Sequence, residues 1–240
     1  MIDRPGIRVL LLDVEGTTTA VSFVYDVLFP HARAHLREFL EASPNEPATR
    51  DDLAALRAER QAEKEPGAPE WRGGGQAETL ASASAYAEWL MDRDRKSTAL
   101  KSLQGRIWQG GYQSGALESH VYPDVRPALE RWRGQGRTVA IFSSGSVLAQ
   151  RLLFAHTREG DLTPLLHAYF DTTTGPKREA GSYRRIAEAL RVAPASVRFV
   201  SDVPAELDAA RTAGMGTALC VRDGRAPATD HPVLRTFDEI

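Results

Sequence analysis

Short apolar runs alternate with amphipathic helical stretches at the start of this chain and throughout its second half. Five runs are typical of buried strands: Arg8–Leu12, Arg137–Phe142, Ala168–Phe170, Val197–Val200 and Thr217–Val221. The segments between them have helical patterns, at Pro127–Arg133, Ser146–His156, Ser182–Leu190 and Ala205–Ala213. Because strand–helix–strand units pair their strands in parallel and pack the helices on the sheet, the pattern predicts an α/β fold with a parallel sheet covered on both faces.

Between about residues 20 and 120 the alternation stops, and helical patterns follow one another without strands. These patterns lie at Tyr25–Glu41, Arg50–Glu63, Ala77–Asp92 and Ser97–Tyr112, and the Pro- and Gly-rich segment Lys64–Gly75 is typical of a loop. Pro30 is expected to divide the first helix, because a proline inside a helix removes a hydrogen bond and clashes with the preceding turn. We therefore expect an α/β core domain of residues 1–19 and 121–240, with an all-helical cap domain of residues 20–120 inserted after the first strand.

The composition argues against several classes of function. Over 240 residues the formal net charge is -2, and Lys and Arg form no basic stripe, so we expect no nucleic-acid partner. No apolar run is long enough for a secretory signal or a membrane span, so we expect no membrane association. The single cysteine, Cys220, cannot form an internal disulfide, which suits a reducing compartment. We expect a cytoplasmic globular protein.

The first strand ends in two acids, Asp13 and Glu15, followed by Gly16 and three threonines. A strand buried on both faces has no structural use for carboxylates at its tip, and ligands of open α/β sheets bind at the carboxyl ends of the strands. An aspartate there can bind Mg²⁺ or attack phosphorus, and a second acid can transfer a proton. The alternative is a helix N-cap cluster, because Asp and Thr both cap helices well.

The ends of three later strands carry groups that suit the same chemistry. Ser143 and Ser144 precede a helix, where hydroxyl and backbone N–H groups bind phosphate, although a serine there is also an ordinary helix cap. Lys177 lies in a loop before a helix, where its charge either reaches a phosphate or an acid, or is simply solvated. Asp202 adds a carboxylate for a Mg²⁺ site, while Glu206 suits either a secondary role at the metal or the helix dipole. Together these groups predict phosphoryl transfer through an aspartate.

This arrangement resembles the haloacid dehalogenase superfamily of aspartate-nucleophile phosphatases. The segment from Tyr122 to Gly136 also resembles the one before that superfamily's serine-bearing strand. Within the superfamily, four segments are similar to the signatures of the enolase-phosphatase E1 family: Asp13–Arg33, Leu100–Tyr112, Phe142–Val147 and Phe170–Lys177. Most superfamily members carry Asp two residues after the nucleophile, and the glutamate at position 15 is distinctive of this family.

The resemblance implies an enzyme, an acireductone synthase of methionine salvage, with a Rossmann-like core and an inserted helical cap. Such an enzyme enolises 2,3-diketo-5-methylthiopentyl-1-phosphate and then hydrolyses the enol phosphate to the acireductone 1,2-dihydroxy-3-keto-5-methylthiopentene and phosphate. The resemblance also implies Mg²⁺ as the cofactor, a small phosphorylated molecule as the substrate and a monomeric protein.

The resemblance further implies a role for each residue at a strand end. Asp13 would attack phosphorus, form a phosphoaspartyl intermediate and bind Mg²⁺. Glu15 would protonate the leaving oxygen, activate water and bind Mg²⁺ through its backbone carbonyl. The two serines after the second strand would bind the phosphoryl oxygens, Lys177 would offset the charge of the phosphate, and Asp202 would complete the metal's ligands.

Two alternatives to this function remain. One is a haloacid dehalogenase-type phosphatase that hydrolyses another small phosphomonoester without enolising it. The other is a receiver-type switch whose aspartate is phosphorylated but turns over slowly, and both Glu15 and the helical insertion argue against it. The enolisation base is also undecided between Glu15 and a residue of the insertion, where the most recognisable candidates are Arg106, Trp108, Gln109 and Tyr112.

Overall fold

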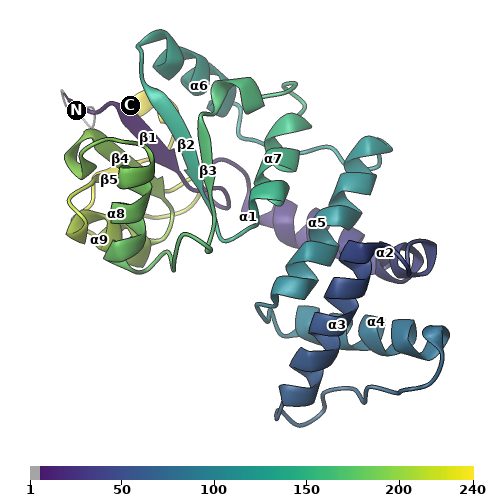
Figure 1. Cartoon of the computed structure of the whole chain (residues 1–240). Helices are drawn as coiled ribbons and strands as arrows, with labels where there is room; N and C mark the ends of the chain where they lie inside the picture. The colour runs from purple at the N-terminus through teal and green to yellow at the C-terminus, as the bar shows by residue number, and fades with distance from the viewer. Residues whose placement is uncertain (1–5) are drawn as a thin grey trace. The chain divides into compact units, whose positions relative to one another are not determined.

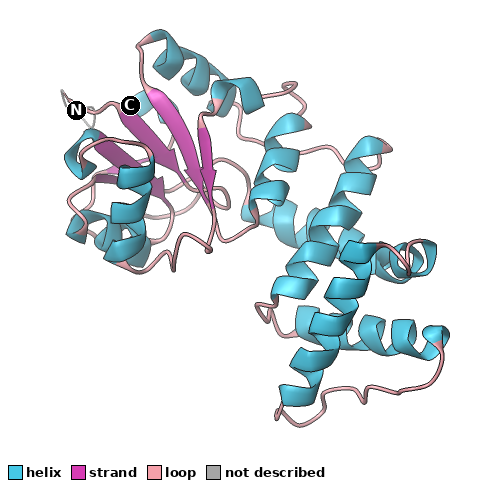
Figure 2. Ribbon diagram, viewed as in Figure 1, coloured by secondary structure: helices cyan, strands magenta, loops and turns pink. Residues whose placement is uncertain are grey.

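The computed structural model describes residues 6–240, which form two compact units. The α/β unit consists of the described residues up to Val24 together with Glu118–Ile240, and the helical unit consists of Tyr25–Leu117. Figures 1 and 2 show that the strands of the sheet belong to the first unit, while the second is built from helices and loops. Residues 1–5, with which the predicted core segment 1–19 begins, lie outside the described residues.

The α/β unit is built on one sheet with the strand order β3-β2-β1-β4-β5-β6. Every neighbouring pair runs parallel, which confirms the parallel α/β core predicted from the sequence. Leu12 of β1 is in register with Ile141 of β2 and Val200 of β4, so the carboxyl ends of these three strands lie side by side. The strands are β1 (Val9–Leu12), β2 (Thr138–Phe142), β3 (Ala168–Phe170), β4 (Val197–Ser201), β5 (Gly216–Cys220) and β6 (Val233–Leu234).

The sixth strand is absent from the sequence-based prediction. In β6, Val233 and Leu234 pair with Leu219 and Cys220 of β5. Two residues are too few to show an alternating apolar pattern, so only the position of this segment beside β5 makes it a strand.

Helices cover both faces of the sheet. Figure 1 shows α6 (Val125–Gly134) and α7 (Val147–Ala155) on one face, and α8 (Ala180–Ala189) and α9 (Pro204–Thr212) on the other. The rings of Phe142, Tyr183 and Phe199 contact one another in the core without solvent exposure. Short 3-10 helices η2 (Thr163–Leu165) and η3 (Pro194–Ser196) lie in connections, and η4 (Phe237–Glu239) lies at the C-terminal end after β6. β1 is buried along its whole length, as a central parallel strand should be.

The helical unit contains four α-helices where the sequence predicts helical stretches: α2 (Phe29–Ala42), α3 (Pro47–Ala62), α4 (Gln76–Asp92) and α5 (Thr98–Gln113). The short helix α1 (Val21–Phe23) and a π-helix, η1 (Val24–Leu28), precede α2. The first predicted helix is therefore divided, and Pro30 lies in the first turn of α2, where a backbone N–H has no partner within the helix. Among residues 6–240, no helix of either unit has both the length and the apolar character that crossing a membrane requires.

Candidate active site

Asp13 stands directly after β1, in the middle of the sheet. Its backbone N–H donates a hydrogen bond to the carbonyl of Val200 on β4 at 2.9 Å, so the parallel pairing continues to this residue. Asp13 is only 2% exposed. A carboxylate in such a position needs partners that compensate its charge.

The chain after Asp13 folds back in a tight turn, which we call the β1 loop (residues 13–19). The amides of residues 17–19 all donate hydrogen bonds to the carbonyl of Val14. Gly16 adopts a φ of 69°, a left-handed conformation that other residues rarely tolerate. A Cβ atom at this position would collide with Oδ2 of Asp202, so the glycine also lets the Asp202 carboxylate approach the loop backbone.

Lys177 compensates the charge of Asp13. Its Nζ lies 2.6 Å from Oδ1 of Asp13 and 2.7 Å from Oε2 of Glu206. Burial by itself would lower the pKa of Lys177, but the charges and hydrogen bonds of the two carboxylates outweigh burial, so its pKa is raised. The hydroxyl of Tyr183 donates to the Lys177 carbonyl at 2.7 Å and so fixes the backbone of this loop. Lys177 is therefore a buried ion-pair partner and not a solvated surface lysine.

Ser201 has no role in the sequence-based prediction, yet it contacts the same carboxylate. Its hydroxyl donates to Oδ2 of Asp13 at 2.7 Å and lies 3.3 Å from Oε2 of Glu206. Ser201 is the last residue of β4, and it is fully buried. The only sequence signal for this contact was its position at a strand end, immediately before Asp202.

Glu206 lies in the first turn of α9, where the sequence left its role open. The structure buries its carboxylate against Lys177 instead of leaving it at a solvated helix terminus. Burial, followed by the negative charge of Asp13, raises the pKa of Glu206. Glu206 therefore belongs to the polar cluster around Asp13.

Glu15 and Asp202 both have raised pKa values. Desolvation, followed by the negative charge of Asp13, raises the pKa of Glu15 to about 7. The same two causes, in the same order, raise the pKa of Asp202 to about 6. Near neutral pH the Glu15 carboxyl is therefore present in both its protonated and its ionised form, as a general acid–base requires.

Ser143 and Ser144 follow β2, the strand next to β1 in the sheet. Ser143 is almost fully buried, and its hydroxyl accepts a hydrogen bond from the amide of Gly145 at 3.0 Å. Because the hydroxyl accepts in this bond, it retains its own hydrogen for donation to a ligand. Ser144 is half-buried.

The N-terminus of α7 is already capped, which changes the expectation that its N–H groups would bind phosphate. The hydroxyl of Ser146 accepts a hydrogen bond from the amide of Ala149, and Oδ2 of Asp171 accepts one from the amide of Val147, both at 3.2 Å. These bonds satisfy two of the N–H groups that the start of a helix leaves unpaired. A phosphate at this strand end would depend on the two serines rather than on these amides.

The donor groups at the end of β1 suit a hard divalent cation. The carboxylates of Asp13 and Asp202 and the carbonyl of Glu15 all offer oxygen, the element that Mg²⁺ prefers. Four carboxylates, including those of Glu15 and Glu206, share the single ammonium group of Lys177, so a further positive charge would reduce their repulsion. Within residues 6–240 there is no group of three or more Asp, Glu, His or Cys side chains placed to bind a metal ion together. Mg²⁺ usually keeps several waters and needs only one or two carboxylates, so the residues present fit this ion.

Two of the helical residues considered for enolisation have structural partners. Arg106 of α5 forms an ion pair with Asp52 of α3 at 2.5 Å and donates to the hydroxyl of Thr49 at 2.8 Å. Nε1 of Trp108 donates to the carbonyl of Leu28 at 2.7 Å. These contacts hold α5 against its neighbours within the helical unit, which favours a packing role for both residues.

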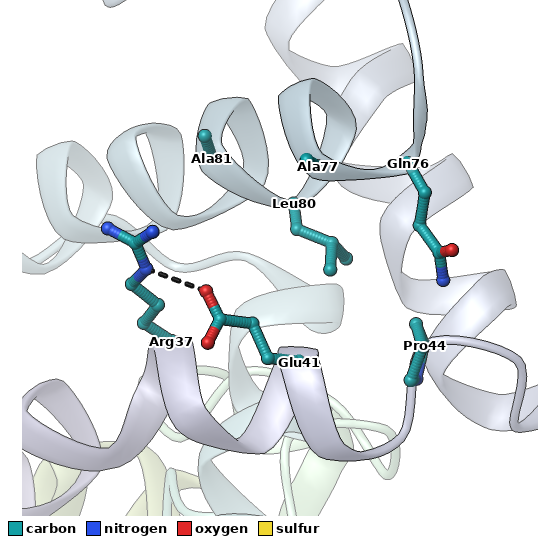
Figure 3. Close-up of a pocket in the computed structure, with 7 residues that line it drawn as sticks. All are labelled: Arg37, Glu41, Pro44, Gln76, Ala77, Leu80 and Ala81. Atoms are coloured by element: carbon teal, nitrogen blue, oxygen red, sulfur yellow. Dashed lines mark hydrogen bonds and ion pairs between the residues drawn. The ribbon is translucent and has the colours of Figure 1, made fainter.

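The helical unit also contains a pocket of about 350 Å³, shown in Figure 3. Arg37 and Glu41 of α2 form an ion pair at its edge, at 2.8 Å. The pocket contains none of the predicted site residues. Its lining residues are Arg37, Glu41, Pro44, Gln76, Ala77, Leu80 and Ala81.

Known proteins similar to this chain have the parallel α/β fold described above. The family model of haloacid dehalogenase-like hydrolases matches residues 7–214, and with the parallel sheet it defines the chain as a hydrolase of this class. The Enolase-phosphatase E1 of Synechococcus elongatus is 51% identical over 98% of both chains, and that of Sorangium cellulosum is 50% identical over 97% of both. The solved structure of the UTR4 protein of Saccharomyces cerevisiae is 30% identical, with a TM-score of 0.78 over 98% of this chain and 100% of that one. The chain belongs to the enolase-phosphatase E1 family, and it is an enzyme, a phosphatase.

Proposed function

We propose that this chain is a Mg²⁺-dependent bifunctional enolase-phosphatase of methionine salvage. It would enolise 2,3-diketo-5-methylthiopentyl-1-phosphate and then hydrolyse the enol phosphate to the acireductone and phosphate. The observation that carries the proposal is the carboxylate of Asp13, held by Lys177 at 2.6 Å and by Ser201 at 2.7 Å, in a chain 51% identical to an Enolase-phosphatase E1.

Asp13 is the residue best placed to attack phosphorus. Its Oδ1 accepts hydrogen bonds from Lys177 and from the amide of Val14 at 2.8 Å, and its Oδ2 accepts one from Ser201. Partners on both oxygens orient the carboxylate before a substrate arrives, which lowers the entropic cost of attack. A bond from one carboxylate oxygen to phosphorus would form the phosphoaspartyl intermediate while the enol oxygen leaves.

Glu15 would carry the proton. With a pKa of about 7, its carboxyl can protonate the leaving oxygen and then accept a proton from the water that attacks the phosphoaspartate. The same group is our candidate for the enolisation step, which needs proton transfer at a carbon next to a carbonyl. The engagement of Arg106 and Trp108 in helix packing supports Glu15 over these two residues.

The phosphoryl group and the metal would be bound at neighbouring strand ends. The two serines after β2 would donate hydrogen bonds to the phosphoryl oxygens, and Lys177 would offset their charge. Asp13, Asp202 and the backbone carbonyl of Glu15 would hold Mg²⁺. When bound, the ion would supply positive charge that stabilises the transferring phosphoryl group.

The proposal extends to the organisation of the protein. Residues 20–120 would act as a cap domain and exclude water during the reaction, and residues 1–19 with 121–240 would form the catalytic core. We further propose a monomer in the cytoplasm that acts on a small phosphorylated molecule, without a nucleic-acid or membrane partner. The net charge of -2 supports the absence of a nucleic-acid partner.

The test is to follow ultraviolet absorbance and phosphate release together, with purified protein, Mg²⁺ and the diketo phosphate under anaerobic conditions. We expect a transient enol phosphate, followed by acireductone and an equal amount of phosphate. An Asp13→Asn variant controls for contaminating phosphatases. If the protein releases phosphate from simple phosphomonoesters but leaves the diketone unchanged, the phosphatase part stands and the enolase part is wrong.

A further inference from the structure

Arg222 lies shortly after β5, beyond residue 214, where the match to the haloacid dehalogenase-like family ends. Its side chain is only 6% exposed. Nε and Nη2 both donate hydrogen bonds to the backbone carbonyl of Thr17, at 2.9 and 2.7 Å. Two donors from one planar guanidinium fix this carbonyl in direction as well as in distance.

The guanidinium is itself held on all sides. Nη1 forms an ion pair with Oδ2 of Asp124 at 2.7 Å and donates to the carbonyl of Arg235 at 3.2 Å. The ring centroids of Tyr122 and Phe237 lie 4.3 and 4.5 Å from its Cζ. Such cation–π contacts, together with a buried ion pair, make Arg222 a rigid anchor for whatever it binds.

Thr17 belongs to the β1 loop, two residues after Glu15. It is fully buried, and its hydroxyl has no hydrogen-bond partner among the residues that the structure describes, so its side chain does not anchor the loop. Two residues outside the loop donate hydrogen bonds to its carbonyls here: Arg222 donates twice to that of Thr17, and the amide of Tyr122 donates to that of Thr18 at 3.0 Å. Loss of the Arg222 bonds would leave a buried carbonyl unpaired at the turn that carries Glu15.

We propose that Arg222 is a positioning residue for the phosphatase reaction. It acts through the Thr17 carbonyl, holding the β1 loop so that Asp13 and Glu15 keep their places. The proposal rests on the roles that the proposed function gives to these two acids. It also assigns a function to the segment after residue 214, because Arg222 and the ring of Phe237 both come from it.

The experiment compares three full-length variants with the wild type. Arg222→Met removes every hydrogen-bond donor of the side chain while keeping most of its volume. Arg222→Lys keeps the positive charge but cannot donate two hydrogen bonds in the geometry of a guanidinium. Arg225→Met is the matched control, because Arg225 lies in the same segment and is exposed. For each protein we would measure kcat and KM on the diketo phosphate and on simple phosphomonoesters, with hydrogen exchange of the peptide covering residues 13–19.

For Arg222→Met we expect kcat to fall by about 10- to 100-fold with KM within about threefold, because a small misplacement of catalytic groups has an effect of this size. Hydrogen exchange in residues 13–19 should rise while that of β2 and β4 stays unchanged. Arg222→Lys should recover part of the loss, and Arg225→Met should match the wild type.

A purely structural role for Arg222 would give another pattern. The melting temperature of Arg222→Met would fall, while kcat below that temperature and exchange of the β1 loop stayed at wild-type values, and this result would overturn the proposal. If Arg222→Met does not fold, Arg222→Lys and its loop exchange decide the question. If the wild type hydrolyses simple phosphomonoesters but not the diketo phosphate, the proposed enolase function is wrong. The role of Arg222 is then still tested by kcat on the simple phosphomonoesters and by hydrogen exchange of the β1 loop.

Discussion

Each unit of this protein buries a small polar cluster, and the two clusters differ in their balance of charge. The helical cluster consists of Arg106, Asp52, Thr49 and Ser102. Its guanidinium meets the buried carboxylate of Asp52 at 2.5 Å and the half-exposed carboxylate of Glu46 at 3.5 Å. The hydroxyls of Thr49 and Ser102 bond to this pair at 2.8 Å each. The buried guanidinium balances the buried carboxylate of Asp52, and the second carboxylate, that of Glu46, is half exposed to solvent, so the cluster needs no ligand to be stable.

The site cluster consists of Asp13, Lys177, Ser201 and Glu206, in which one ammonium meets two carboxylates at 2.6 and 2.7 Å. Glu15 and Asp202 add two further acids whose pKa values are raised by desolvation and by the charge of Asp13. This excess of negative charge is stable only with protons or a cation. Charge balance, and not burial alone, therefore separates a packing cluster from a functional one.

The largest effect is expected from Asp13→Asn, which removes the proposed nucleophile of the site cluster. Phosphate release should slow by at least about 1,000-fold, as for other enzymes that lose their nucleophile. The melting temperature should stay the same or rise, because one of several repelling carboxylates loses its charge while Lys177 keeps Glu206 as a partner. Steady-state phosphate release and thermal unfolding measure the two results, with Asp51→Asn on the exposed face of α3 as the control. Retained activity in Asp13→Asn would remove Asp13 from the mechanism.

Lys177→Met should break the site cluster in a different way. Phosphate release should slow by roughly 100- to 1,000-fold, because the charge of the transferring group loses its partner. Unlike Asp13→Asn, this variant should also unfold at a lower temperature, since it leaves two buried carboxylates without their cation. Adding Glu206→Gln to it should restore much of the melting temperature but none of the activity. Equal melting temperatures for the single and double variants would show that Glu206 is not paired with Lys177 in solution.

The pKa of Glu15 predicts how the stability of the metal-free protein depends on pH. Folding raises this pKa from 4.5 to about 7, so the folded state holds the proton more tightly than the unfolded state between these values. The contribution of Glu15 to stability is therefore complete below pH 4.5 and is lost as the pH rises from 4.5 through about 7. Asp202 adds a similar loss between pH 3.8 and about 6.

Glu15→Gln tests this dependence. In the presence of a metal chelator, the melting temperature of both proteins should fall when the pH rises from about 5 to about 8. The fall should be roughly 3–6 °C smaller for Glu15→Gln than for the wild type. Glu38→Gln, at an exposed position of α2, serves as the control and should follow the wild type. Identical pH profiles for Glu15→Gln and the wild type would mean that the raised pKa does not occur in the metal-free protein.

The smallest effect on catalysis is expected from Arg106→Met in the helical cluster. The free energy of unfolding should fall by about 2–3 kcal/mol, because Asp52 keeps its charge in a partly buried position without its partner. At temperatures below unfolding, kcat should stay within about twofold of the wild type, since the balanced pair serves packing. The exposed Arg37–Glu41 pair in Figure 3 is the contrast, and Arg37→Met should leave the melting temperature unchanged. A large loss of kcat in folded Arg106→Met would place this residue in the reaction after all.

Much of the fold could be predicted from the sequence because its signals are local. Each of the first five strands is an apolar run bounded by turn residues, and the helical stretches show their period within a dozen residues or so. β6 was missed because two residues carry no period, and the capping of α7 by Asp171 was missed because the two groups are brought together only by the pairing of β2 with β3.

The sequence by itself determined the order of strands and helices along the chain, the run of helices between the first two strands and the presence of acids, hydroxyls and a lysine at the strand ends. Those features follow from local patterns and from the rule that parallel strands end at one edge of the sheet. Only the tertiary structure decided that Lys177 bridges Asp13 and Glu206, that Ser201 holds Asp13, and that Arg106 packs against Asp52. Arg222 and Thr17 are 205 residues apart in the chain, and a hydrogen bond over that separation leaves no trace in local periodicity, because only the packed sheet brings its two groups within reach.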